Sequence, residues 1–584
     1  MAIASIVGRA GWAARFSLAV ALSAMIGSAA LAQVVERNAP PAHQPGPSVI
    51  APPNAVPAQQ DPTPIGPDLR AVVLLGPTEP ARASVADGID AAAAEHAKPE
   101  KLARALRPYL GRRLSRRLIA EVEARVARVY RAAGYPFVSV STPEQEITSG
   151  ALQIRVAEFR TAKIAATEKS HAAADYLTSR VRLHPGDPVS SVALSEDLDW
   201  LNRYPFRRVE AVFSPGAGLG QTNLSLRATD SKPWFVYAGY GDTGSASSGW
   251  NRYFAGAEVG GLLAPDSFAS FQATSSGVPV VDKQSASDPR YVSYAGRFVL
   301  PTNPRGELEA TADWVETDET SSPFLVRQTT LEGSLGYRFA LSNLSPALLG
   351  AGDGRFGVEA RRQGSQTLFS GADAQNMAMQ VFQLYLGWEK TENDPFGHAD
   401  LDLEAHLSPG GIDAENSDAQ MRLYSQGHVG GARYAYLDLT FSRTTQLIDN
   451  FSWTLQAIGQ YSARALPRTE QVGLGGAALV RGYSLDDGAY DEAIVVRNEL
   501  HAPRLAIQQG GQAFSFSPYL FVDAGVGRDQ FARRSVSAAS IGPGGDLQLT
   551  NYLALSLDGG YALKSAVYTR SGGGRVEMRL TCSY

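Results

Sequence analysis

The feature that most constrains the fold is the alternation of apolar and polar residues that fills residues 234–584. Leu384 and Leu386, for example, alternate with Gln383 and Tyr385. Runs of this kind, separated by clusters of Gly, Asn, Asp and Pro, are typical of β-strands that have one face in an apolar environment. The last three fifths of the chain are therefore predicted to be all-β.

Sixteen such runs are expected to be strands, and this even number fits outer-membrane barrels, whose strands need ~9–11 residues to cross the bilayer. A soluble sandwich or propeller is the alternative, but such folds seldom reach sixteen strands in one domain without repeats. We therefore predict a sixteen-stranded antiparallel transmembrane barrel. Its expected strands are 234–241, 252–263, 268–276, 291–300, 307–317, 327–339, 354–363, 379–392, 398–408, 433–447, 451–464, 491–502, 517–529, 537–549, 552–563 and 575–584.

The first 32 residues have the organisation of a secretory signal peptide. Arg9 and Arg15 precede an apolar run over residues 16–26, and the small residues at 30–32 fit a cleavage site. A transmembrane anchor is the alternative, but the run is shorter than the ~20 residues that a spanning helix needs. No later apolar run is long enough to span as a helix, so the mature chain can cross a membrane only as a closed β-barrel.

Three further segments precede the alternating region. Residues 33–68 are rich in proline, which favours an extended and mobile linker. Residues 69–158 and 159–230 then follow the same order of strand, helix, strand and strand. We expect two small α/β domains there, followed by the barrel over residues 231–584. Each domain would end in a small sheet whose edge could accept another chain.

Charge and cysteine content exclude several classes of function. The net charge is −5 without a Lys/Arg-rich run, so nothing favours nucleic-acid binding. Cys582 is the only cysteine, which excludes a disulfide framework and a thiolate metal site, and its place in the last run puts it against lipid. No catalytic or metal-ligand spacing stands out, so we expect neither an enzyme nor a metal or cofactor. Isolated histidines such as His428 and His501 are expected to be structural or solvated.

Two short motifs indicate an ion pair inside the barrel. Val480-Arg481-Gly482-Tyr483 lies in a Gly-rich segment between the eleventh and twelfth expected strands. Phe521-Val522-Asp523-Ala524-Gly525 lies in the thirteenth, and period two places Asp523 on its polar face. A carboxylate on that face of a membrane strand needs a cation, and we predict that Arg481 supplies it.

The whole mature chain resembles the two-partner-secretion transporters, the FhaC/ShlB/HecB-like haemolysin secretion and activation proteins of the BamA-like superfamily. The two motifs together carry the resemblance to the superfamily, and the count of two α/β units indicates the secretion branch. Segments 130–135 with 148–156 match the family's first POTRA domain, segments 197–206 with 214–224 match the second, and the chain ends on an aromatic residue as outer-membrane proteins do.

The resemblance implies a signal peptide, two periplasmic POTRA domains and a sixteen-stranded barrel in the bacterial outer membrane. It also implies that the extracellular loop with the first motif folds inward and is held by the second. Family members often begin with a helix that plugs the barrel, but residues 33–39 are too short for a stable helix and proline follows. The candidate loop-anchoring and gating residues are Arg481, Gly482, Tyr483, Asp523 and Gly525.

These features predict an outer-membrane transporter that captures an unfolded, β-helix-forming exoprotein in the periplasm by strand addition and secretes it through the barrel. The candidate docking strands are residues 209–213 and 222–227. The candidate passenger-binding residues are Val209, Val212, Phe213, Leu224 and Leu226.

Other functions fit less well. A diffusion porin explains the barrel but not the two α/β domains, and a BamA-type assembly factor would be favoured by more POTRA repeats. The expected partners are the secreted exoprotein, outer-membrane lipid and the barrel-assembly machinery, with no nucleic acid and a monomeric state. Adhesin, cytolysin and contact-dependent toxin all stay open as the class of passenger.

Overall fold

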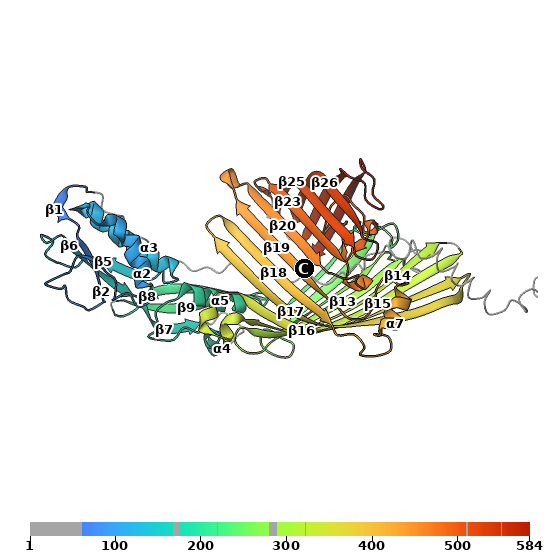
Figure 1. Cartoon of the computed structure of the whole chain (residues 1–584), viewed down its shortest axis with the longest axis horizontal. Helices are drawn as coiled ribbons and strands as arrows, with labels where there is room; N and C mark the ends of the chain where they lie inside the picture. The colour runs from blue at the N-terminus through green and yellow to red at the C-terminus, as the bar shows by residue number, and fades with distance from the viewer. Residues whose placement is uncertain are drawn as a thin grey trace, which may run out of the picture.

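The computed structural model describes residues 61–166, 174–218, 220–278, 289–321, 323–509, 512–550 and 552–584. The predicted signal peptide, residues 33–60 of the predicted linker and the short segment 33–39 lie outside the described residues. Figure 1 shows two small α/β units in a row beside a large barrel, with the second unit next to the barrel.

The first unit is a mixed sheet covered by helices. Ser115 caps the longer helix by accepting a hydrogen bond from the Leu118 backbone N–H, and the helix then buries a stripe that ends at Tyr130. The sheet order is β3-β2-β6-β5. Its elements are β2 (Ala71–Leu75), β3 (Gly88–Asp90), α2 (Pro99–Leu106), η1 (Arg107–Tyr109), α3 (Arg116–Ala132), β5 (Val138–Ser141) and β6 (Ala151–Glu158).

A two-stranded ribbon corrects the linker prediction. Strand β1 (Pro64–Asp68) pairs with β4 (Arg113–Ser115), although residues 33–68 were expected to be an unpaired linker. Proline is tolerated on an edge strand because an edge leaves one side of the backbone without a partner. The linker prediction is therefore wrong over residues 64–68.

The second unit has the strand, helix, strand, strand order predicted from the sequence. Its sheet order is β7-β9-β8, so β9 is the central strand and β8 is an edge. Leu177, Leu194 and Leu198 from the helices pack against the sheet. The elements are β7 (Arg160–Ala166), α4 (Ala174–Ser179), α5 (Ser191–Leu201), β8 (Arg207–Pro215) and β9 (Gln221–Asp230).

The barrel closes through pairing of its first and last strands. Strands β23 and β24 both pair with β25, so together they count as one strand position around the barrel. The barrel therefore has sixteen strand positions, which confirms the prediction. The strands are β10 (Trp234–Gly241), β11 (Arg252–Gly260), β12 (Phe268–Ser275), β13 (Tyr291–Pro301), β14 (Gly306–Ser321), β15 (Phe324–Ala340), β16 (Asp353–Phe369), β17 (Ala372–Asp394), β18 (Gly397–Ser408), β19 (Tyr434–Gln446), β20 (Ser452–Tyr461), β23 (Glu492–His501), β24 (Leu505–Gln509), β25 (Gln512–Asp529), β26 (Arg534–Thr550), β27 (Leu553–Ala562) and β28 (Gly574–Ser583).

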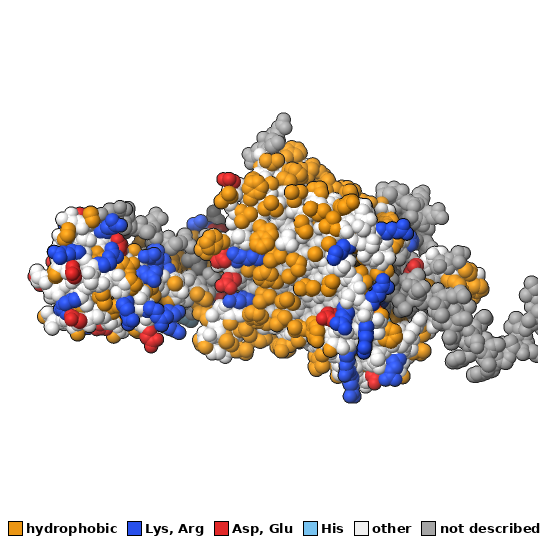
Figure 2. Space-filling model, turned by 45° about the horizontal axis from the view of Figure 1, so that its top comes forward, with side chains coloured by type: hydrophobic (Ala, Val, Ile, Leu, Met, Phe, Trp, Pro, Cys, Tyr) orange, Lys and Arg blue, Asp and Glu red, His pale blue; other side chains and the backbone are white. Residues whose placement is uncertain are grey.

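The two faces of the strands follow the predicted alternation. Leu384 and Leu386 are exposed on the outside of β17, whereas Gln383 is fully buried. Cys582 is also exposed. Figure 2 shows hydrophobic side chains spread over the barrel surface, whereas charged groups are prominent on the unit beside it. The outer surface of the barrel is therefore suited to lipid.

The two ends of the barrel differ. We call the end next to the second α/β unit the inner rim and the opposite end the outer rim.

Among the described residues, no helix is both long and apolar enough to cross a membrane. The remaining short elements, all in connections, are η2 (Leu341–Asn343), η3 (Pro346–Leu348), α7 (Asp418–Tyr424), η4 (Ile448–Asn450), η5 (Arg468–Glu470), β21 (Val472–Gly473), η6 (Leu485–Asp487) and β22 (Ala489–Tyr490).

Candidate functional site in the lumen and at the inner rim

Residues 462–491 connect β20 to β23 at the outer rim and fold back into the barrel; we call them the lumen loop. The pairing of β21 with β22 forms its neck. Val480 and Arg481 are fully buried. Arg481 contacts Asp523, which lies six residues inside the outer end of β25, or about 20 Å along a strand at ~3.3 Å per residue. The loop therefore reaches well into the lumen.

Arg481 is the centre of the loop's polar contacts. Its Nε and Nη2 donate to the two carboxylate oxygens of Asp523 at 2.8 and 2.9 Å. Nη1 lies 2.7 Å from a Glu499 oxygen and 3.3 Å from an Asp558 oxygen. The guanidinium stacks 3.7 Å from the centre of the Phe521 ring. One buried cation thus joins carboxylates of β23, β25 and β27, which favours a single position of the loop.

The next two residues fix the loop against the wall. Gly482 has φ +85°, and a Cβ there would lie 3.0 Å from the Gly560 carbonyl carbon on β27. Only glycine allows both this conformation and this close approach. The buried Tyr483 hydroxyl lies 2.7 Å from the Lys564 carbonyl oxygen and accepts a hydrogen bond from the Ala539 N–H at 3.1 Å. The predicted residues beside Arg481 therefore contact β26, β27 and the loop after β27.

Gly525 leaves room for the apolar side of the loop. A Cβ at this position would lie 2.8 Å from Leu474 Cδ1 and 3.1 Å from Val480 Cγ2. Leu474 and Val480 belong to a buried cluster with barrel residues that include Val495 and Ala538. The second motif therefore contacts the loop in two ways. The Asp523 carboxylate pairs with Arg481, and the absence of a side chain at Gly525 leaves space for Leu474 and Val480.

Two aspartates extend these contacts to other outer connections. Asp487 Oδ1 accepts the backbone N–H groups of Tyr568 and Thr569 at 2.7 and 2.8 Å. Asp486 accepts the Ala246 N–H at 2.9 Å, in the connection between β10 and β11. The lumen loop thus bridges connections from both sides of the barrel seam.

Glu499 and Asp558 also belong to this site, although the two sequence motifs do not include them. Both were on polar faces of predicted strands, so their inward orientation could have been inferred from the alternation. Their convergence on Arg481 depends on the register of three strands and on the depth of the loop, and a single sequence contains no signal for either.

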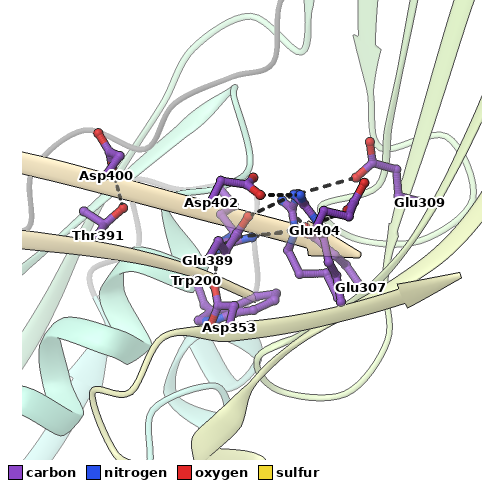
Figure 3. A network of polar contacts seen from close by, with 12 residues as sticks. Trp200, Glu307, Glu309, Asp353, Glu389, Thr391, Asp400, Asp402 and Glu404 are labelled. Atoms are coloured by element: carbon purple, nitrogen blue, oxygen red, sulfur yellow. Dashed lines mark hydrogen bonds and ion pairs between the residues drawn. The ribbon is translucent and has the colours of Figure 1, made fainter. Parts of the chain in front are cut away.

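A second arginine contacts three carboxylates at the inner rim. Arg203, just after α5, approaches Glu307 at 3.3 Å and Glu389 at 3.1 Å, and it also pairs with Asp353. Its guanidinium stacks 4.1 Å from the centre of the Trp200 ring. Figure 3 shows these carboxylates converging near Trp200. Although burial opposes the charge, the carboxylates raise the pKa of Arg203, so the second unit brings a fixed cation to the barrel.

Barrel arginines share the same carboxylates. Arg338 lies 3.4 Å from Glu307 and 3.5 Å from Glu389, and Arg355 lies 3.6 Å from Glu389. The acidic groups at this rim are thus partly neutralised by the barrel itself. Arg203 joins an existing network and does not supply its only positive charge.

Further contacts hold the second unit at the inner rim. Arg207 binds Asp266 in the turn between β11 and β12, with Nη1 2.7 Å from Oδ1. Tyr176 donates its hydroxyl to the same carboxylate at 3.0 Å, and burial raises the pKa of Tyr176 to about 12, which keeps the proton in place. Arg305 in the next turn lies 2.8 Å from Asp197 of α5. The docking is therefore spread over several turns.

Apolar residues complete this interface. Phe206 of the second unit is buried against Phe268 and Val299 of the barrel, with Tyr204 and Phe235 packed at the edge of the cluster. Because this contact is non-polar and the charged contacts are distributed, loss of one ion pair should leave the second unit in place.

The structure does not place the predicted passenger-binding side chains on an open surface. Val209, Leu224 and Leu226 lie in the core of the second unit with at most 1% exposure. Phe213 packs on Phe137 of the first unit, with ring centroids 4.2 Å apart, and Val212 is half-buried on the solvent side of β8. The prediction is wrong for the three core residues, because the alternation identifies a face but does not say whether helices cover it.

The backbone edge of β8 offers a different surface. Asn202 binds both the N–H and the C=O of Val209, at 2.7 and 3.0 Å, on the side away from β9. Because antiparallel strands alternate their bonding direction, Ala211 and Phe213 also direct their backbone groups to that side. Ala211 is only 3% exposed, so the accessible part of this edge begins at Phe213. Residues 222–227 belong to the central strand β9 and have no such edge. Of the two predicted docking strands, only β8 has the required geometry.

Two groups of described side chains lie close enough together to hold a metal: Glu95, His96 and Glu158, and His428, Asp491 and Asp529. Several of the possible ligand atoms in both groups already form hydrogen bonds or ion pairs within the protein. Glu158 pairs with His96 at 2.6 Å. Asp491 accepts hydrogen bonds from the Leu466 N–H and the Gln530 N–H.

Comparisons with known proteins agree with this architecture. The family described as "Haemolysin secretion/activation protein ShlB/FhaC/HecB" matches residues 355–545, which include the lumen loop and both motifs. The family described as "POTRA domain, ShlB-type" matches residues 85–158 in the first unit. A search of curated proteins gives no match.

Solved structures share the fold over nearly the whole length. CdiB from Escherichia coli has a TM-score of 0.66 at 15% identity, covering 98% of this chain and 99% of its own. CdiB from Acinetobacter baumannii has a TM-score of 0.55 at 13% identity, covering 97% of both chains. At these identities the likeness concerns the fold.

Proposed function

Because the chain belongs to the haemolysin secretion/activation family of ShlB, FhaC and HecB, we propose that it is a two-partner-secretion transporter of the bacterial outer membrane. It takes an unfolded exoprotein from the periplasm and passes it through the barrel to the outside. The POTRA domains and the inner rim face the periplasm, and the outer rim faces the exterior. The observation that carries the proposal is the lumen loop, held deep in the barrel by Arg481 and Asp523.

The lumen loop has two roles in this proposal. It fills part of the lumen, which limits leakage of small solutes, and its fixed position leaves a defined path along the remaining wall. An exoprotein segment that moves in extended form needs a path free of mobile obstruction. Release of the loop should therefore increase leakage and decrease secretion together.

Capture would occur at the edge of β8. The backbone groups of Ala211 and Phe213 face away from β9, and strand addition needs such groups more than it needs particular side chains. Asn202 occupies the neighbouring backbone groups of Val209, so the docked segment would be short. Weak pairing over a few residues would let the passenger dissociate from β8 and continue through the barrel.

The remaining partners follow from the same proposal. The exposed apolar barrel surface would contact outer-membrane lipid, and the barrel-assembly machinery would insert the chain. We propose that the transporter acts as a monomer, without enzymatic activity or a cofactor and without nucleic acid as a partner. The passenger would be an unfolded, β-helix-forming exoprotein.

Secretion of the exoprotein encoded in the neighbouring reading frame tests the function. Cells that express the intact chain should release this exoprotein into the medium, and cells without the chain should retain it. Retention in both strains would reject the proposed function.

The β8 edge is tested in the same assay. Ala211→Pro removes one edge-facing N–H while the ladder with β9 keeps its own bonds, so secretion should fall several-fold. Arg208→Ala and Glu210→Ala change side chains on the solvent side of the same strand and serve as controls. Equal secretion by all three variants would place capture elsewhere.

A further inference from the structure

The root of the lumen loop carries a buried carboxylate that neither motif contains. Glu470 is the last residue of η5, and its side chain has 0% exposure. Burial of an isolated carboxylate is costly, so such a group persists only where the protein provides a cation or several hydrogen bonds. Glu470 has both.

Three strands of the barrel wall supply these partners. Arg361 of β16 pairs with Glu470 Oε2. Gln383 of β17 donates to the same oxygen at 3.0 Å, and the Tyr436 hydroxyl of β19 donates at 2.8 Å. Thr469 donates its hydroxyl to the other carboxylate oxygen at 2.7 Å. Glu470 is therefore fully engaged, and most of its partners belong to the barrel wall.

The neighbouring loop residues follow the same wall. Gln460 of β20 donates to the Glu470 carbonyl oxygen at 2.8 Å, which fixes the backbone as well as the side chain. Leu466 is fully buried in a cluster with Met379, Val381 and Tyr434. The root of the loop is thus packed as firmly as its tip.

The root and the tip of the loop contact different parts of the barrel wall. Glu470 contacts side chains of β16, β17 and β19, whereas Arg481 contacts carboxylates of β23, β25 and β27. Arg361 on β16 and Asp523 on β25 are six places apart in a ring of sixteen. The loop therefore spans part of the lumen between its two sets of charged contacts.

We propose that Glu470 is a second anchor of the lumen loop, paired with Arg361, and that the loop is held between two separate parts of the barrel wall. This inference rests on the proposed function, because the position of the loop matters only if the lumen is a conduit. Glu470 acts as a positioning residue: it sets where the loop lies and does not itself contact a passenger. Two anchors on separate parts of the wall restrict sideways movement that a single anchor at Arg481 would allow.

Arg361 does not depend on Glu470 for its charge. It lies 3.1 Å from Glu359 and 3.6 Å from Glu332 on the barrel itself. Without Glu470, Arg361 would still be neutralised by the barrel carboxylates, but the loop would lose its contact with the wall. The variant should therefore alter the position of the loop and not the assembly of the barrel.

The test measures loop release directly. Ala478 in the loop is replaced by Cys in a Cys582→Ser background, and reaction with a bulky polyethylene-glycol maleimide is followed on intact cells. Glu470→Gln and Arg361→Gln should each raise the labelling rate about tenfold, because a hydrogen bond to a charged group is lost. Tyr436→Phe should give a smaller rise. Ion conductance of the purified variants in planar bilayers should rise in the same order.

The adjacent pair Arg362 and Glu415 provides a matched control. It also joins β16 to an outer connection, at 2.9 Å, but it is largely exposed. Arg362→Gln should change neither labelling nor conductance. Heat-modifiable mobility on gels checks that each barrel is assembled, and the isosteric Glu470→Gln is the variant chosen to keep it so.

Combined variants separate a second anchor from an indirect effect. Glu470→Gln with Arg361→Gln should be no worse than either alone, because both remove one contact. Glu470→Gln with Arg481→Ala should multiply the two effects, because the anchors are independent. Labelling of Glu470→Gln at the control rate, or a combination with Arg481→Ala no worse than Arg481→Ala alone, would overturn the proposal. Labelling and conductance need no exoprotein, so this outcome is independent of the secretion assay.

Discussion

Two arginines, Arg481 in the lumen loop and Arg203 in the second POTRA domain, each meet three carboxylates from three barrel strands, yet their surroundings differ. Arg481 has 1% side-chain exposure and forms a two-pronged contact with the fully buried Asp523. Arg203 has 19% exposure, and two of its carboxylates, Glu307 and Glu389, are shared with barrel arginines. Glu499 beside Arg481 is shared as well, with Arg497 and His501, so burial and the two-pronged contact with Asp523 distinguish the two sets of charges.

The difference indicates what each contact does. The loop tip depends on one cation that nothing else replaces at Asp523, so the position of the loop should be sensitive to a single substitution. The POTRA docking combines a shared network with Arg207, Asp197 and an apolar cluster, so it should tolerate the same kind of substitution. A similar count of ion pairs thus gives a sensitive element in one place and a robust joint in the other.

The largest effect is expected at the loop tip. Arg481→Ala and Asp523→Ala each remove a buried charge-assisted contact and leave the partner uncompensated, which should weaken the hold on the loop roughly ten- to a hundredfold. Secretion should fall strongly, while the barrel still assembles with heat-modifiable mobility. The double variant should be little worse than either single one.

Additive secretion defects would contradict this coupling. So would protease cleavage of the lumen loop in intact wild-type cells, because it would place the loop outside the barrel.

An intermediate effect is expected at Gly482. Gly482→Ala puts a side chain at φ +85° and within 3.0 Å of the β27 backbone, so it should cost about 1–2 kcal/mol of conformational strain plus the clash. Gly411→Ala is the control, because Gly411 has φ +72° in another outer connection with open space around it. Secretion should fall for Gly482→Ala and stay near wild type for Gly411→Ala. Equal defects would assign the effect to strain alone.

The smallest effect is expected at the inner rim. Arg203→Ala should reduce secretion by no more than about fivefold, because a shared and partly exposed ion pair contributes roughly 1 kcal/mol or less. Arg208→Ala, which removes an exposed side chain from the same unit, should have no effect. A loss of secretion as large as that of Arg481→Ala would show that docking of the second unit depends on one contact, and it would contradict the proposed difference between the two arginines.

The barrel was predictable because its signal is local. Alternation identified all sixteen strands and placed Asp523 and Leu384 on the correct faces. The hairpin of β16 and β17 was underestimated: β17 begins at Ala372 where 379 was expected, because this outer extension, which includes Asp373, Gln375 and Asn376, lacks the apolar alternation. Strand propensity alone could not reveal a segment whose stability comes from its partner strand.

The site was predictable only where a motif marked it. The contact of Arg481 with Asp523 was expected from two short motifs and from the need of a buried carboxylate for a cation. Glu499, Asp558 and Glu470 were missed because their roles arise from loop depth and strand register, which are properties of the folded barrel. Val209, Leu224 and Leu226 were predicted to bind the passenger, but helices cover the face of the sheet on which their side chains lie.

The most direct test of the central claim is the proximity of the lumen loop to β25. Val480 Cγ2 lies 3.1 Å from the position of a Cβ on Gly525, which brings cysteines at these two positions close to disulfide geometry. In a Cys582→Ser background with Leu474→Ala, which removes the Cδ1 atom that would lie 2.8 Å from that Cβ, Val480→Cys with Gly525→Cys should form an intramolecular disulfide in high yield under mild oxidation. The yield should collapse when Arg481→Ala is added. Absence of the disulfide in the assembled parent protein, or the same yield with and without Arg481, would contradict the account.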